Sequence, residues 1–231
     1  MEEKIKIIYE DDNILVLDKP VGLEIYREEG KDGEPTLVNW LLLKYPEIKQ
    51  VGPDPARPGI VHRLDKGVSG LLVVAKNEAS FENLIKQFEE RKTRKEYIAL
   101  VYGKVSKDEG VIDFPIARAK SGRFAALPPN HEGGRIAITE YEVIERFVNF
   151  TLLSVRIKTG RTHQIRVHLF ALGCPIVGDI LYNQKKIKKA PLNRIFLHSA
   201  KLGFYDLENS WREYESELPL ELKSFFETLR R

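Results

Sequence analysis

Cysteine and long apolar runs are both scarce in this sequence. Cys174 is the single cysteine among 231 residues, which excludes an intramolecular disulfide and a cysteine-rich zinc site and fits a reducing cytoplasm. No apolar stretch approaches the ~18 residues of a membrane span. The amino terminus, MEEKIKIIYEDD, is charged on both sides of a short apolar run and does not read as a signal peptide. We therefore expect a cytoplasmic globular protein.

An excess of charge of one sign is also missing. Lysine and arginine number 37, aspartate and glutamate 34, and the formal net charge is only +3. This balance excludes a strong positive electrostatic field over the whole protein. Any surface that binds nucleic acid must therefore be a local basic patch. Apolar residues make up 42% of the chain, which is enough for a sizeable core.

The hydrophobic pattern predicts strands with a few interspersed helices. Strands are expected at 5–10, 14–18, 70–75, 97–103, 138–146, 151–158 and 196–204. Helices are expected to begin at Thr36, Asn77, Thr162 and Pro219. Residues 113–135 read as a loop. Because strands and helices do not alternate regularly, the fold class is α+β, with a mixed, largely antiparallel central sheet and flanking helices.

Most common catalytic motifs are absent. The chain has no P-loop sequence, and Leu71 stands where a nucleophile elbow beginning at Gly67 needs its last glycine. His163 and His168 are five residues apart, whereas four would place two imidazoles on one helical face. We therefore predict no metal site and no cofactor.

Two polar segments stand out. His62-Arg63-Leu64-Asp65 lies between a proline-rich loop and the apolar run 70–75. A carboxylate just before a buried strand can act as a nucleophile, as a base or only as a turn cap. The second segment, 158–168, places several polar groups on the first turns of a helix, where they either grip phosphate or form a solvated face.

These segments resemble the RluA-type RNA pseudouridine synthases, a family that includes ribosomal large-subunit pseudouridine synthases. Six blocks occur in the family's order: DKPVGL at 18–23, HRLDKGVSGLLVVAKN at 62–77, KEYIALVYG at 95–103, GRTHQIRVH at 160–168, GCPIVGD at 173–179 and LHSA at 197–200. The resemblance spans most of the chain. It implies the pseudouridine synthase fold with a catalytic cleft.

The resemblance also implies a function and a set of site residues. The expected activity converts uridine to pseudouridine in structured RNA, with ribosomal RNA as the first candidate and tRNA as the second. It implies Asp65 as the essential carboxylate, Tyr97 against the target base and Arg166 as the guanidinium partner of Asp65. Arg63 is expected to fill the gap left by the flipped-out base. The expected substrate-binding residues are His62, Arg63, Arg161, His163 and Gln164.

Phosphate contacts are expected from three basic clusters. Their members are Arg91, Lys92 and Arg94; Arg118, Lys120 and Arg123; and Lys185 to Lys189. Each cluster could equally be an ordinary solvated face.

Some features depart from the family pattern or leave a choice open. Val68 replaces the usual threonine, and Glu24-Ile25-Tyr26-Arg27 stands where the family commonly continues towards His-Pro, which bears on substrate preference. We expect one catalytic domain over residues 1–231, without the separate N-terminal RNA-binding domain of many relatives. RNA is the expected partner and a monomer the expected state, with no membrane contact. The alternative is a non-catalytic RNA-binding or ribosome-assembly protein on the same fold.

Overall fold

The computed structural model describes residues 5–27, 33–128, 131, 133–182 and 192–229. The chain forms two compact units, Met1–Arg94 with Lys201–Ser216 and Lys95–Ala200 with Glu217–Arg231. A single domain over residues 1–231 stays a prediction. In the described part of the chain, no helix is long and apolar enough to cross a membrane. The predicted basic cluster at 185–189 lies outside the described residues.

The first unit begins with three antiparallel strands. Strand β1 (Lys6–Glu10) pairs with β2 (Ile14–Lys19), and β2 pairs with β3 (Ser69–Ala75). Asp11 shapes the turn between β1 and β2, because its Oδ1 accepts the N–H groups of Asn13 at 2.8 Å and Ile14 at 2.7 Å. Every residue of β3 is buried, as the continuous apolar run predicts.

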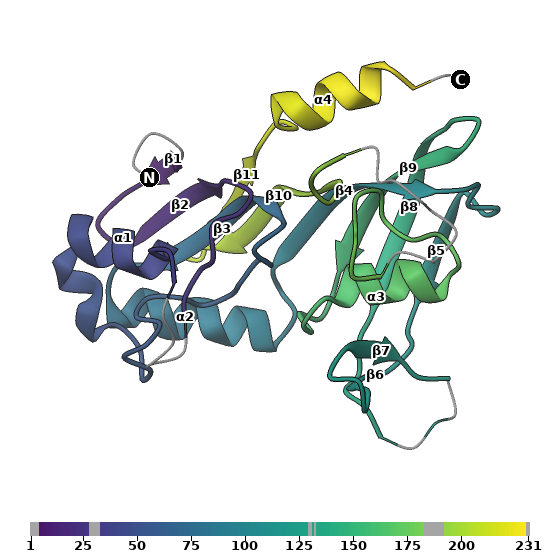
Figure 1. Cartoon of the computed structure of the whole chain (residues 1–231). Coiled ribbons are helices and arrows are strands. Elements are labelled where there is room, and N and C mark those ends of the chain that lie inside the picture. The colour runs from purple at the N-terminus through teal and green to yellow at the C-terminus, as the bar shows by residue number, and fades with distance from the viewer. Residues whose placement is uncertain (1–4, 28–32, 129–130, 132, 183–191, 230–231) are drawn as a thin grey trace. The chain divides into compact units, whose positions relative to one another are not determined.

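Two capped helices pack on this unit, and both predicted starts are confirmed. Helix α1 (Leu37–Lys44) begins with a capping box between Thr36 and Asn39, and a short 3-10 helix, η2 (Pro46–Gln50), follows it. Helix α2 (Glu78–Glu89) begins at Asn77, whose side chain accepts the Ser80 N–H at 3.0 Å. Both α1 and α2 lie on one face of β2 and β3 (Figure 1).

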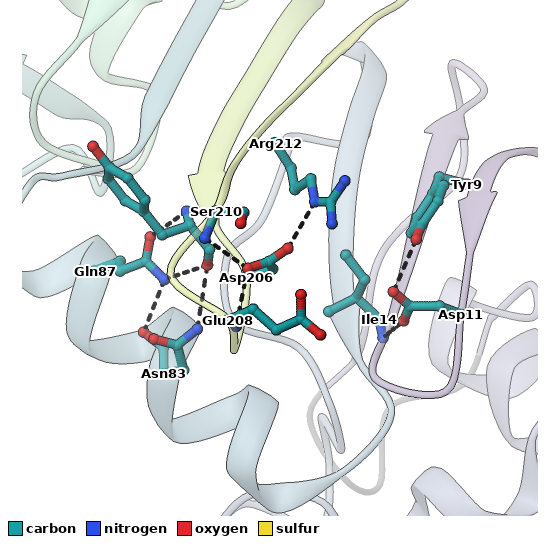
Figure 2. Close-up of polar contacts among 10 residues, drawn as sticks. Tyr9, Asp11, Ile14, Asn83, Gln87, Asp206, Glu208, Ser210 and Arg212 are labelled. Atoms are coloured by element: carbon teal, nitrogen blue, oxygen red, sulfur yellow. Dashed lines mark hydrogen bonds and ion pairs between the residues drawn. The ribbon is translucent and has the colours of Figure 1, made fainter.

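A polar clamp joins α2 to the end of β10 (Leu197–Tyr205). The buried Gln87 side chain donates to the Tyr205 carbonyl at 2.8 Å and accepts the Tyr205 N–H at 2.7 Å, and Asn83 donates to the same carbonyl (Figure 2). Asp206 then shapes the turn into β11 (Trp211–Glu215), which pairs with β10. The sequence pattern did not predict β11.

The second unit holds an antiparallel meander. Strand β4 (Arg94–Tyr102) pairs with β9 (Phe150–Ile157), β9 with β8 (Thr139–Arg146) and β8 with β5 (Glu109–Ile112). Helix α4 (Leu220–Glu227) begins after Pro219, as predicted, and packs the rings of Phe225 and Phe226 against phenylalanines of this unit. The predicted α+β class with a largely antiparallel sheet is confirmed.

Two expectations for this unit are wrong. Residues 113–135 are not only loop, because β6 (Ile116–Arg118) and β7 (Phe124–Ala126) form a hairpin whose strands are too short to show an apolar period. Ile116 packs in one apolar cluster with Val167 of helix α3 (Gln164–Ala171), and tertiary packing therefore stabilises the hairpin. The hairpin lies next to α3 (Figure 1). Thr162 does not cap α3, because the cap residue is His163, which has a left-handed backbone.

Candidate active site

Asp65 lies in a tight turn that leads directly into buried strand β3. The Asp65 carbonyl accepts the Val68 N–H at 3.0 Å, and Ser69 begins the strand. Leu64 and Val68 are 5% and 3% exposed, so the turn is anchored on both sides, while Asp65 itself is half-buried. The fold therefore fixes the backbone around this carboxylate.

His62 ties the start of the turn to the rest of the first unit. Its Nε2 accepts the Val73 N–H at 3.0 Å, and its ring stacks on Phe88 with the ring centroids 4.7 Å apart. An accepting Nε2 is unprotonated, so a neutral ring carries its proton on Nδ1. These contacts give His62 a structural task, and its contact with substrate stays a prediction.

The loop after β2 explains the block DKPVGL. Lys19 is completely buried, and its Nζ donates to the carbonyls of Pro20 and Leu23, each at 2.9 Å. Gly22 has a φ of +85°, which glycine adopts readily. Its N–H donates to the Lys66 carbonyl at 2.8 Å, so this loop is bound to the turn that carries Asp65.

In the second unit, Arg166 of α3 forms a two-point ion pair with Asp179. Nε lies 2.7 Å from Oδ2, and Nη2 lies 3.0 Å from Oδ1. The two side chains are 13% and 1% exposed. Asp179 also accepts the backbone N–H groups of Leu181 and Tyr182, and the Arg166 guanidinium lies over the Tyr182 ring. Arg166 is therefore held in one orientation.

In the block GCPIVGD, the glycine before Asp179 is required for a steric reason. Gly178 has a φ of +77°, and a Cβ there would lie 1.9 Å from the Arg194 carbonyl oxygen, so no other residue fits. The sequence alone predicts no role for Asp179 or Tyr182. The family block that contains Asp179 was the only available indication, because nothing in the spacing pairs it with Arg166.

Gln164, a predicted substrate-binding residue at the start of α3, stabilises the local fold. The Gln164 amide oxygen accepts from Thr159 and from the Arg161 N–H, and its NH₂ donates to Ile138 and Thr139. These four bonds satisfy the amide completely. They give no support to a substrate contact by Gln164.

Arg161 and His163 likewise make internal contacts. Arg161 Nε donates to the Ile136 carbonyl at 3.0 Å. His163 Nδ1 lies 3.0 Å from the Tyr182 hydroxyl, and its ring meets Phe124 of the hairpin edge to face. His163 thus connects the hairpin to the segment after Asp179, and a substrate role for either residue stays a prediction.

Tyr97 lies within β4, opposite Val155 of β9, and is 5% exposed. Its neighbour Lys95 is also buried, and burial lowers the pKa of Lys95 to about 8. His168 is fully buried between the Thr139 hydroxyl and the Phe114 carbonyl, and burial lowers its pKa. His168 is therefore an internal residue.

The two described basic clusters differ in their partners. Lys92 pairs with Glu90, and Arg94 pairs with Glu213. By contrast, Arg118 donates to the Gly122 carbonyl and Arg123 to the Leu181 carbonyl. Among the residues that the structure describes, no carboxylate pairs with this hairpin cluster, which also contains the exposed Lys120. The hairpin cluster is the better phosphate-binding candidate, because no internal anion neutralises it.

The predicted site residues are distributed over both units. His62, Arg63 and Asp65 belong to the first unit, whereas Tyr97, Arg161, His163, Gln164 and Arg166 belong to the second. The predicted pairing of Arg166 with Asp65 stays a prediction.

Comparisons with known proteins agree with one another. A family model described as RNA pseudouridylate synthase matches residues 13–171. An uncharacterized RNA pseudouridine synthase of Aquifex aeolicus is 43% identical over 97% of this chain and 73% of its own length. A Zymomonas mobilis protein named ribosomal large subunit pseudouridine synthase D is 35% identical, with the same coverage of both chains. The solved structure of human RNA pseudouridylate synthase domain containing 1 superimposes with a TM-score of 0.77 at 26% identity, covering 94% of this chain and 84% of that one.

Proposed function

The chain belongs to the RNA pseudouridylate synthase family and is an isomerase, and we propose that it modifies ribosomal large-subunit RNA with Asp65 as its catalytic carboxylate. The observation that carries the proposal is the family match, because the matched residues 13–171 include Asp65, Tyr97 and Arg166. The target class rests on relatives named for the ribosomal large subunit. Transfer RNA is the second candidate substrate.

The reaction needs no redox partner. The glycosidic bond between N1 and the ribose C1′ breaks, and a bond between C5 and C1′ forms. The proton on C5 leaves, and N1 gains a proton, so atoms and electrons balance within the nucleoside. We therefore assign no cofactor to the site.

Asp65 is the group that we assign to the bond exchange. Three routes fit the balance: attack on the base, attack on the sugar, or removal of a proton from C2′. Each route uses the Asp65 carboxylate, and the tight turn before buried strand β3 fixes the backbone that carries it. Fixing the group before the reaction lowers the entropic part of the barrier.

Arg166 and Tyr97 are the other residues to which we assign catalytic roles. The bidentate pair with Asp179 orients the Arg166 guanidinium in advance, so that it can stabilise developing negative charge without reorganisation. A planar guanidinium suits this task better than a lysine ammonium. Tyr97, on the sheet, is assigned to the face of the extruded base.

RNA affinity is assigned to the hairpin β6–β7 and its arginines. Arg118 and Arg123 are held by backbone carbonyls, which leaves their positive charge for phosphates. Binding should weaken as salt rises, because each phosphate contact releases counterions.

The test is release of tritium from RNA labelled at uracil C5. Unmodified ribosomal RNA and tRNA would be supplied separately to wild type, to Asp65→Ala and to Asp12→Asn. Asp12 is an exposed turn residue and serves as the matched control. We expect release from ribosomal RNA by wild type and Asp12→Asn, and none by Asp65→Ala. Equal release by Asp65→Ala would show that another group does the chemistry, and release from tRNA alone would correct the substrate.

A further inference from the structure

Arg63 is an exposed cation next to the proposed catalytic turn. It stands two residues before Asp65 and is the exposed residue between half-buried His62 and buried Leu64. Among the described residues, no carboxylate forms an ion pair with Arg63. An arginine that pairs with no internal carboxylate can bind an external anion. RNA offers such an arginine phosphates and base edges.

Tyr26 is the residue that Arg63 contacts. Arg63 Nη1 donates to the Tyr26 hydroxyl at 3.0 Å, and the guanidinium carbon lies 5.3 Å from the centre of the Tyr26 ring. Arg57 approaches the same ring at 5.9 Å, but its own charge is occupied by Asp54 at 2.8 Å. The ring therefore presents its hydroxyl and its π-electrons mainly to Arg63.

The segment that carries Tyr26 is itself firmly anchored. The carbonyls of Glu24 and Ile25 accept the N–H groups of Leu37 and Val38 at the start of α1, at 2.8 and 2.9 Å. Ile25 is 3% exposed. Tyr26 thus projects from fixed backbone, whereas the arginine it contacts has a long side chain with many rotamers.

We propose that Tyr26 is a positioning residue that holds Arg63 in the orientation needed to engage RNA. Its hydroxyl and ring select one direction for the guanidinium before RNA arrives. Because an unrestrained arginine loses rotamer entropy when it binds, prior restraint increases the effectiveness of the contact. The inference rests on the proposed function.

The proposed role of Tyr26 concerns a segment in which this sequence departs from the family pattern. Tyr26 stands in the segment 24–27, which does not follow the family's usual continuation after DKPVGL. A tyrosine offers an arginine both an aromatic face and a hydrogen-bond acceptor. In this chain, Tyr26 makes both contacts with Arg63.

A double-mutant cycle tests the proposal. Tritium release would be measured for Tyr26→Phe, Tyr26→Leu, Arg63→Ala and Tyr26→Leu/Arg63→Ala, on the RNA that wild type modifies. We expect kcat/KM to fall about twofold in Tyr26→Phe, which keeps the ring, and about fivefold in Tyr26→Leu, as for an exposed cation–π contact. In the Arg63→Ala background, Tyr26→Leu should change kcat/KM by less than about 1.5-fold, because no guanidinium remains to be oriented.

A control variant and the double mutant together distinguish a positioning role for Tyr26 from a structural one. Tyr9→Phe removes another tyrosine hydroxyl of the same unit, one that donates to Asp11, and should leave kcat/KM unchanged. An equal loss from Tyr26→Leu with and without Arg63 would show a merely structural role and overturn the inference. A gain in activity from Tyr26→Leu would show that Tyr26 restrains Arg63 unproductively, and would also overturn it. Undiminished release by Asp65→Ala would instead refute the proposed catalytic role of Asp65, an outcome distinct from those of the Tyr26 cycle.

Discussion

Replacing Asp179 with alanine should both destabilise the protein and disorient Arg166. The carboxylate is 1% exposed, and it accepts two bonds from Arg166 and two from the backbone of Leu181 and Tyr182. Asp179→Ala leaves the Arg166 guanidinium, 13% exposed, without this anion. Loss of one partner of a buried pair costs about 3–5 kcal/mol, more than the pair itself contributes.

The expected free-energy loss is large enough to measure by ordinary unfolding experiments. For a chain of this size, about 3–5 kcal/mol corresponds to a fall in Tm of roughly 10 °C. Urea unfolding followed by circular dichroism would give the free energy, and tritium release at a temperature where the variant is folded would give the activity. We expect kcat to fall at least about tenfold, because the orientation of the guanidinium is lost.

A surface pair provides the control, and a small effect would refute the reasoning. Lys201 and Glu215 pair on the surface with side chains 32% and 65% exposed, so Glu215→Ala should cost less than about 1 kcal/mol. A loss below about 1 kcal/mol in Asp179→Ala would show that Arg166 finds another anion or water. A stable Asp179→Ala variant with unchanged kcat would show that the pair orients nothing.

Three further predictions concern stability. Gly178→Ala should cost more than about 2 kcal/mol in urea unfolding, because its Cβ would meet the Arg194 carbonyl at 1.9 Å. Gly103→Ala, with a φ of +81° and open space around it, should cost only the ~1–2 kcal/mol of left-handed strain, and equal costs would contradict the steric argument. Lys95 has a pKa of about 8 in the fold against 10.5 in an unfolded chain. The unfolded state therefore binds more protons between these values, and the free energy of unfolding should rise with pH by up to about 3 kcal/mol across this window. Lys95→Met should lack this rise, and a slope unchanged in that variant would assign it to another group. Thr36→Ala removes the hydroxyl of the capping box and should lower the free energy of unfolding by about 1 kcal/mol, whereas Thr36→Ser should retain most of it.

Local physics explains why much of the first unit could be read from the sequence. The caps at Thr36 and Asn77 involve groups only three residues apart, and the burial of β3 follows from its continuous apolar run. The predicted cap at Thr162 is wrong because the cap residue of α3 lies one position later, at His163, whose left-handed backbone (φ 56°) no sequence pattern indicates.

The sequence by itself determined the family and the identity of the candidate carboxylate, because both depend on the order and composition of short blocks. The tertiary structure decided which groups hold the site residues. Arg166 meets Asp179 across 13 residues and Arg63 meets Tyr26 across 37, with no periodicity to link the partners. Such contacts depend on how loops close and where elements pack, here on a left-handed glycine at 178 and on Lys19 buried beneath its loop. These features are properties of the packed chain, so only its folded form reveals them.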